Sequence, residues 1–128
     1  PVQERSGVES ISRISTLKKN TRDLELITEK TNHLCDQVYE HLAQSGLSFK
    51  SVGIVAVMTD MSILSRSETF ENPTDDLEVL KKTAKELFER LLKESELEAR
   101  RVGVKVFNLI KKEEEQKQLT RFLGFSKS

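Results

Sequence analysis

The stretch EARRVGVKVF, residues 98–107, alternates between two kinds of side chain. The valines form one series and the residues between them form the other: Val102, Val104 and Val106 against Gly103, Lys105 and Phe107. Side chains of a strand point to opposite faces in turn, so this period of two predicts a strand with one packed face and one free face. The free face would carry Arg101 and Lys105, which raises the question of what these two cations contact.

Other segments complete a pattern of strands and helices. Three runs rich in β-branched residues predict further strands: residues 10–17, 50–60 and 62–70. A single residue separates the last two runs, so we expect an antiparallel hairpin. Between the strands, apolar residues recur every three or four positions, as on one side of a helix. These stripes are Leu24, Ile27, Thr31, Leu34, Val38 and Leu42, then Leu77, Leu80, Ala84, Leu87 and Leu91.

The helix ends are predicted from capping residues. Thr21 or Asp23 can begin the first helix, and Gly46 can end it in a left-handed conformation. Asn72 or Thr74 can begin the second helix. The resulting order β-α-β-β-α-β predicts an α+β fold, in which a four-stranded antiparallel sheet has two helices on one face and an open second face. We expect a tether at residues 1–9, the domain at 10–112 and a tail at 113–128.

Composition narrows the class of protein. A chain of 128 residues with 36% hydrophobic and 33% charged residues is typical of one soluble globular domain. Cys35 is the single cysteine, which excludes an internal disulfide and is consistent with the reducing cytoplasm. No apolar run approaches the ~20 residues that span a bilayer, so we expect no membrane partner. The chain begins at Pro1 without a start-like segment, and we interpret it as a piece of a longer protein.

Charge is segregated along a chain whose formal net charge is zero. Residues 23–46 carry one basic and five acidic side chains, and residues 71–99 carry five basic and nine acidic ones. By contrast, residues 1–22 carry five basic and two acidic side chains, and residues 100–112 carry five basic and none acidic. We therefore expect an acidic helix layer and a basic sheet that suits a phosphate backbone. Ordinary solvated charges are the alternative.

Catalytic and metal-binding patterns are weak. His33 and His41 are eight residues apart, which is not the spacing of a metal-binding pair, and we interpret them as surface histidines. Cys35 is expected to be an inert packed thiol, and Asp60 a turn residue. We therefore predict no catalytic residue, metal or cofactor in this chain.

Donor side chains gather on the predicted strands instead. They are Arg13, Thr16, Ser65, Arg66, Ser67, Thr69, Arg100, Arg101 and Lys105. Such groups suit phosphate oxygens. Aromatic residues on which single-stranded bases would stack are few, so duplex DNA is favoured over an RNA-binding surface. In the tail, QKQLTRFL would place Leu119 and Phe122 on one side of a helical turn, as a plug for an apolar pocket of a partner.

With these motifs in place, the chain resembles the little-finger (polymerase-associated) domain of archaeal-type Y-family translesion DNA polymerases, DinB or DNA polymerase IV. The resemblance rests on SISRISTLKKNTRDLE, VAVMTDMSILSRSETF and ARRVGVKVFNLI, in the family's order and spacing. It implies that the open sheet face lies in the major groove and grips the template–primer duplex. The catalytic core of the same polymerase would be a further partner, and the carboxylates that bind its Mg²⁺ would lie in a palm domain absent from this chain.

The resemblance also implies particular residues. The DNA-facing positions would be Ser10, Arg13, Ile14, Val57, Met58, Ile63, Leu64, Ser65, Arg66, Thr69, Arg100 and Arg101, and the charge pattern adds Lys105. Ser12 stands where the family often has glycine, and Glu68 where it often has a basic residue, which would weaken contact at that end.

The tail resembles the family's sliding-clamp box, Q-x-x-L-x-x-F-F. Its residues would be Gln116, Leu119, Phe122 and Leu123, with Leu123 replacing the second aromatic residue. A clamp of the PCNA type would be the partner. The alternative function is a stand-alone ferredoxin-like interaction or regulatory domain, which would bind a ligand in a pocket between helix and sheet and have no affinity for DNA.

Overall fold

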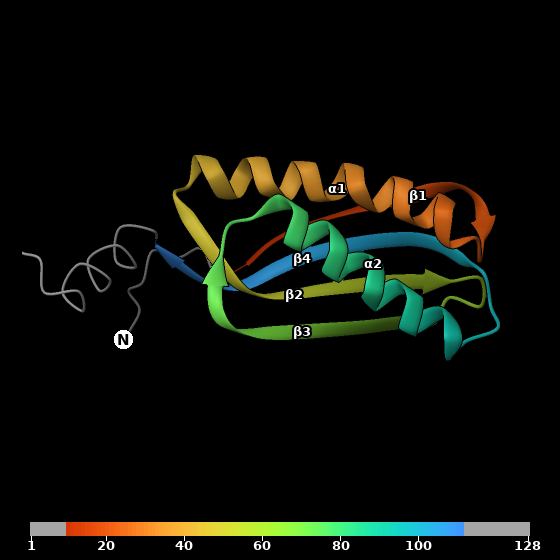
Figure 1. The fold of residues 1–128 in the computed structure, drawn as a ribbon. Helices are drawn as coiled ribbons and strands as arrows, with labels where there is room; N and C mark the ends of the chain where they lie inside the picture. Colours follow the sequence, from red (N-terminus) through yellow and green to blue (C-terminus); the bar gives the residue numbers. More distant parts are fainter. Residues whose placement is uncertain (1–9, 112–128) are drawn as a thin grey trace, which may run out of the picture.

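The computed structural model describes residues 10–111, and its elements follow the predicted order β-α-β-β-α-β. The strands are β1 (Ser10–Thr21), β2 (Leu47–Met58), β3 (Ile63–Thr74) and β4 (Ala99–Lys111), and the helices are α1 (Leu24–Gln44) and α2 (Leu77–Lys93). The strands form one sheet in the order β1-β4-β2-β3, and every neighbouring pair is antiparallel (Figure 1). The predicted tether and clamp box lie outside the described residues.

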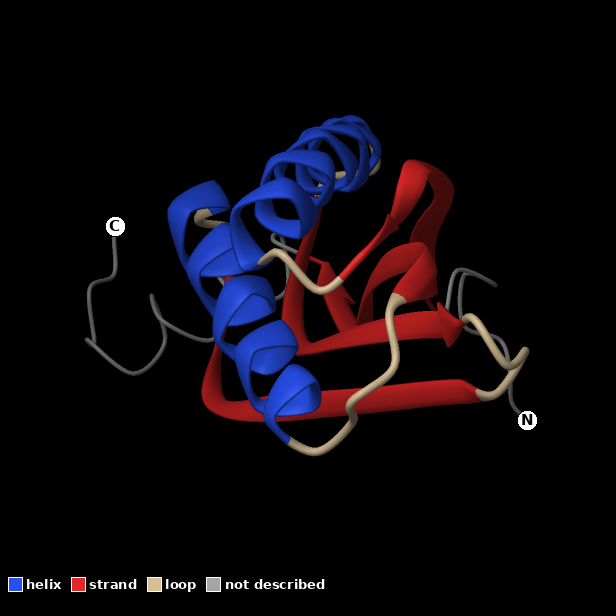
Figure 2. Cartoon of the chain, turned by 90° about the vertical axis from the view of Figure 1, so that its right-hand side faces the viewer, coloured by secondary structure: helices blue, strands red, loops and turns tan. Residues whose placement is uncertain are grey.

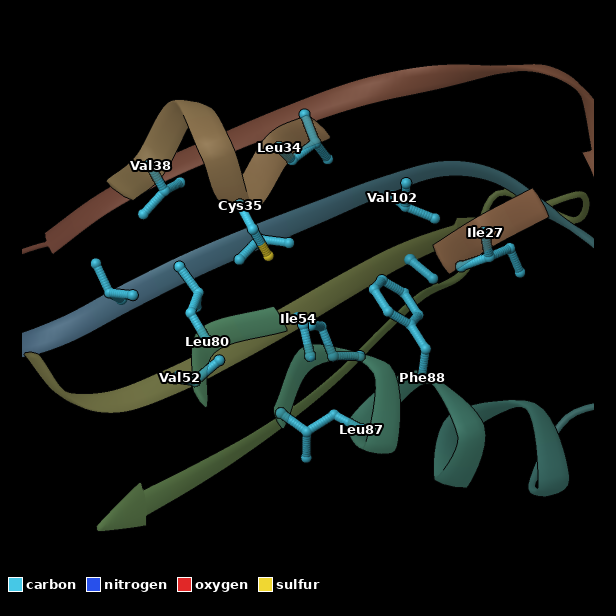
Figure 3. Packing of buried hydrophobic residues seen from close by; sticks show 14 of the residues in the cluster. Ile27, Leu34, Cys35, Val38, Val52, Ile54, Leu80, Leu87, Phe88 and Val102 are labelled. Atoms are coloured by element: carbon cyan, nitrogen blue, oxygen red, sulfur yellow. The ribbon is translucent and has the colours of Figure 1, made fainter. Parts of the chain in front are cut away.

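Both helices cover the same face of the sheet, as predicted (Figure 2). The side chains between the layers come from both apolar stripes and from alternate positions of the two central strands (Figure 3). Ile27, Val52 and Leu80 are fully buried, and so is the thiol-bearing Cys35. Each such aliphatic side chain stabilises the fold by roughly 1.5–3 kcal/mol through removal of apolar surface from water. The core therefore fixes which face of the sheet stays free.

The helix starts follow local hydrogen bonds. Asp23 begins α1, and its carboxylate accepts the Glu25 N–H at 2.9 Å. The prediction for α2 is wrong, because Asp76 begins the helix instead of Asn72 or Thr74. The chain is still extended at Thr74, where β3 ends, so no helix can start earlier.

The turn and bulge residues shape the ends of the sheet. Gly46 has φ +67°, as expected for a residue that ends a helix in the left-handed region. The β2–β3 turn places Met61 at φ 73°, and Asp60 accepts the Ser62 N–H at 2.9 Å. The main-chain hydrogen bond confirms the predicted role of Asp60 in the turn. A hydrogen bond from the Ser62 side chain, together with the main-chain one, lowers the pKa of Asp60.

Candidate nucleic-acid interface

The face of the sheet away from the helices is a grid of four residues from each strand, called here the open face. Its rows are Ser10, Phe107, Ser51 and Thr69; Ser12, Lys105, Gly53 and Ser67; Ile14, Gly103, Val55 and Ser65; Thr16, Arg101, Val57 and Ile63. Residues opposite each other in a ladder share a face, so the register defines this set. Small and hydroxylated side chains predominate on this face.

A groove of about 690 Å³ runs over the middle of the open face, where two glycines replace side chains. The Phe107 ring covers Gly53, because a Cβ added there would lie 3.4 Å from Phe107 Cε1. At Gly103 an added Cβ would lie only 2.7 Å from Val55 Cγ1, so this position has no room for a side chain. The glycines therefore let neighbouring side chains close over the backbone while keeping the centre of the face low.

The charged groups of the open face are all cationic. Arg101 Nε donates to Thr16 Oγ1 at 3.2 Å, and Lys105 Nζ lies 4.9 Å from the centroid of the Phe107 ring. Arg100 lies beside the open face at the β2–β3 turn, with Nη1 3.0 Å from Met61 Sδ. The grid contains no Asp or Glu, so its two cations have no anion beside them on that face. The arrangement suits an anionic ligand that lies flat across the open face.

At the end of the open face that contains Ser10, hydrogen bonds between side chains connect neighbouring strands. Asn108 Nδ2 donates to Ser51 Oγ at 2.7 Å, and Ser51 Oγ lies 2.8 Å from Thr69 Oγ1. Asn108 has φ 55°, a left-handed conformation that asparagine tolerates better than most residues. This chain of contacts links three strands and holds two open-face hydroxyls in fixed positions.

The structure places eight of the predicted DNA-facing residues on the open face. They are Ser10, Ile14, Val57, Ile63, Ser65, Thr69, Arg101 and Lys105. That they bind DNA stays a prediction. The open face also contains Ser12, Ser51, Gly53, Val55 and Phe107, which were not predicted as contacts. The alternation of buried Val52 and Ile54 would have revealed the β2 members, because their neighbours must face the other way.

The side chains of two predicted arginines, Arg13 and Arg66, contact groups on the helix side, which corrects their placement among the open-face side chains, although both residues also line the groove. That these two bind DNA stays a prediction. Arg13 is opposite Val104 in the ladder, and its Nη2 lies 3.4 Å from His41 Nδ1 of α1. Arg66 is opposite Ile54 and forms an ion pair with Glu94. Both side chains also donate to a main-chain carbonyl of their own edge strand.

Two apolar positions and one acidic position need the same correction. Met58 is fully buried and its N–H donates to Ser62 O at 2.9 Å, so neither group is available to a ligand. Leu64 packs against the core. Glu68 also faces the helix layer, with its Oε1 3.8 Å from Arg90 Nη2, so its carboxylate is not part of the open face. The weaker DNA contact expected at that end stays a prediction.

The expected acidic helix layer is confirmed for α1 but is wrong for α2. α1 contains four acidic residues and Lys30 as its basic residue, whereas α2 contains five basic residues and three acidic ones. Most acidic residues of segment 71–99 lie just outside α2: Glu71, Asp75, Asp76, Glu94, Glu96 and Glu98. The net charge of segment 71–99 did not reveal this, because it combined the charges of α2 with those of the residues on either side of the helix.

The side chains that could act in catalysis or bind a metal lie apart from one another. Cys35 is buried, and desolvation raises the pKa of its thiol to about 12, which keeps it protonated and unreactive near neutral pH. His33 and His41 are exposed, as predicted. Within residues 10–111 there is no group of three or more His, Cys, Asp or Glu side chains that could hold a metal ion. In that same range no helix is long and apolar enough to cross a membrane.

Comparison with known proteins gives the family. Residues 8–120 match the model of the impB/mucB/samB family C-terminal domain. The chain belongs to this family. It is a little-finger domain of a Y-family DNA polymerase, as the sequence motifs indicated.

Relatives of known sequence and structure agree with this assignment. The little-finger domain is 40% identical to DNA polymerase IV of Nitrosopumilus maritimus over 108 residues, which cover 84% of this chain and 30% of that protein. A solved Y-family DNA polymerase chimera of Dbh and Dpo4 superimposes with a TM-score of 0.78 and 28% identity, over 87% of this chain and 31% of that one. The chain thus spans about a third of the length of such polymerases.

The fold also occurs in a solved complex of a β-clamp processivity factor and the little-finger domain of Pol IV. That structure gives a TM-score of 0.63 at 15% identity, over 77% of this chain and 86% of that one. At this identity the likeness is one of fold. The shared fold includes the open sheet with both helices on one face.

Proposed function

We propose that this domain grips the template–primer duplex of a translesion DNA polymerase by placing its open face in the major groove. Arg101 and Lys105 would neutralise phosphates, while the hydroxyl groups of the open face would donate to phosphate oxygens. Nucleotidyl transfer, with its Mg²⁺, would belong to a catalytic domain outside this chain. The domain would therefore contribute affinity and positioning without carrying out chemistry.

The observation that carries this proposal is the composition of the open face. A free sheet face with two cations, seven serines or threonines around a glycine-lined groove, and no carboxylate among its sixteen positions favours a polyanion. Phe107 is its one aromatic residue, and Lys105 already lies against that ring. A surface that stacks successive unpaired bases needs more aromatic side chains, so duplex DNA is the better ligand.

A second part of the proposal concerns the tail. Gln116, Leu119, Phe122 and Leu123 would bind a sliding clamp of the PCNA type, on the strength of their spacing. These residues lie outside the described range, and the proposal rests on sequence. The alternative is a regulatory domain with a ligand pocket between the helices and the sheet. The packing between these two layers disfavours it, because side chains such as Val52 of the sheet and Leu80 of α2 are fully buried in one core.

Fluorescence anisotropy of the 128-residue chain with a labelled primer–template tests DNA binding. Between about 20 and 200 mM salt, affinity should fall steeply and depend little on base sequence. The Arg101→Ala/Lys105→Ala variant should bind more weakly, and its salt slope should be shallower by about 1.8, because each lost phosphate contact removes ~0.9.

The matched control is Lys82→Ala/Lys85→Ala, which removes the same charge from exposed positions of α2. This variant should keep the wild-type slope. Absence of binding at the lowest salt, or equal effects of the two variants, would refute a phosphate grip by the open face.

A further inference from the structure

A second cationic feature lies at the β1 edge of the sheet and is not part of the open face. It is a cleft of about 410 Å³ between the end of β1 and the first turns of α1, called here the edge cleft. The exposed Leu26 supplies most of its apolar surface, over the buried Leu17. Lys18, Lys19, Lys30 and Glu29 supply its charges.

The edge cleft exists because the pairing of β1 with β4 is interrupted near the end of β1. Thr16 pairs with Arg101, but the next ladder partners are Thr21 and Ala99, so four residues of β1 have no β4 partner. Figure 1 shows β1 curving away toward the start of α1 at this point. The irregularity carries Lys18 and Lys19 outward and leaves space beside α1, as a bulge at the edge of a sheet does.

The lysines of the edge cleft form no ion pair with the described residues. Among residues 10–111, none of the three lysines has a carboxylate within ion-pair distance, although Glu29 lines the same space. Lys81 of α2, by comparison, lies 3.0 Å from Asp36 of α1. Three cations against one carboxylate give the edge cleft a net positive charge that the described residues leave uncompensated.

The edge cleft is also continuous with the open face. Thr16 receives the Arg101 N–H on the open face, and Lys18 follows two residues later, about 7 Å along the strand. Arg101, Lys18, Lys19 and Lys30 therefore form one cationic path around the β1 edge. Lysine binds phosphate as a point charge, without the fixed geometry that arginine demands, which suits a path followed by a flexible backbone.

We propose that the DNA backbone continues from the open face over the β1 edge into the edge cleft. There Lys18, Lys19 and Lys30 neutralise phosphates, and the sugars lie against the exposed side chain of Leu26. This inference rests on the proposed function and enlarges its footprint from the sheet to α1. An acidic peptide with an apolar anchor would suit the same chemistry, but the direct continuity with a carboxylate-free sheet face favours DNA.

The salt dependence of binding separates this footprint from the open face. We compare the 128-residue chain with Lys18→Gln/Lys19→Gln/Lys30→Gln and with the control Lys82→Gln/Lys85→Gln/Lys93→Gln, which changes net charge equally on exposed positions of α2. Binding to a labelled primer–template is followed over salt. The cleft variant should show a slope shallower by about 2 to 3, since each phosphate contact contributes ~0.9, and the α2 control should keep the wild-type slope.

Acetylation of lysines in the complex gives an independent readout. Bound DNA should protect Lys18, Lys19 and Lys30 from a lysine-acetylating reagent several-fold, while Lys82 and Lys85 react as in the free chain. Equal reactivity with and without DNA, or equal slopes of the two triple variants, would overturn the inference and leave the edge cleft to another partner such as an acidic peptide.

The failure of the proposed function has a different signature. If the wild-type chain binds and only the Arg101→Ala/Lys105→Ala variant has a shallower slope, the open face grips DNA and the extended footprint is wrong. If the wild-type chain does not bind at the lowest salt, both proposals are refuted.

Discussion

At the scale of single residues, Gly103 sets the shape of the open face. A Cβ at this position would lie 2.7 Å from Val55 Cγ1 and 3.3 Å from Ile14 Cγ1. A β-branched neighbour such as Val55 has little rotamer freedom with which to move away. We therefore expect Gly103→Ala to lower the free energy of unfolding by about 1–3 kcal/mol, the usual cost of overpacking. Urea denaturation followed by circular dichroism measures this.

Gly53 is the matched control, because it lies on the same face of the neighbouring strand. Its added Cβ would meet Phe107 Cε1 at 3.4 Å, close to ordinary contact, so Gly53→Ala should change stability by less than Gly103→Ala. Removing the clashing methyls in Gly103→Ala/Val55→Ala should recover part of the loss. If Gly103→Ala is as stable as the wild-type chain, the crowding does not constrain this position.

At the scale of elements, the start of α2 depends on one carboxylate. Asp76 accepts the Glu78 N–H at 2.9 Å, and this bond satisfies a main-chain donor that has no partner within the helix. Asp76→Ala should cost about 1 kcal/mol of unfolding free energy, within the 0.5–2 kcal/mol typical of such caps. Asn72→Ala should be nearly neutral, because Asn72 lies in β3. Thermal unfolding of both variants tests this, and a larger loss at Asn72 would contradict the assigned helix start.

Most elements could be predicted from the sequence because periodicity is a local property. The alternation at Val102, Val104 and Val106 gave β4 and its free face, and the apolar stripes gave both helices. The assignments that failed depended on orientation. Arg13 was predicted from its donor groups, although its spacing from buried Ile11 puts it on the helix side. Arg66 was misplaced in the same way, because a guanidinium group suits a phosphate and a protein carboxylate such as that of Glu94 equally well.

At the scale of the whole molecule, folding places cationic side chains on one face of the sheet and keeps acidic side chains off that face. A chain with no net charge presents a sheet face whose charged positions are all cationic, because strand register and the placement of both helices on one face leave the carboxylates elsewhere. The edge cleft depends on the same sorting, and its cause is a break in pairing between Thr16 and Thr21 that no period in the sequence indicated. Non-local pairing therefore determines the interface, although local patterns determine the elements.

The arrangement of the whole molecule also predicts that DNA binding by the folded domain and clamp binding by the tail can be separated. The buried core runs from Ile11 to Val106, and the open face ends at Phe107, whereas the proposed clamp box begins at Gln116. A chain ending at Lys112 should therefore keep its unfolding temperature within a few degrees and its affinity for primer–template. It should lose binding to a PCNA-type clamp, measured by surface plasmon resonance, as should Leu119→Ala/Phe122→Ala in the full chain. If the truncated chain still binds the clamp, the contact must come from the folded domain, and the assignment of the tail would be wrong.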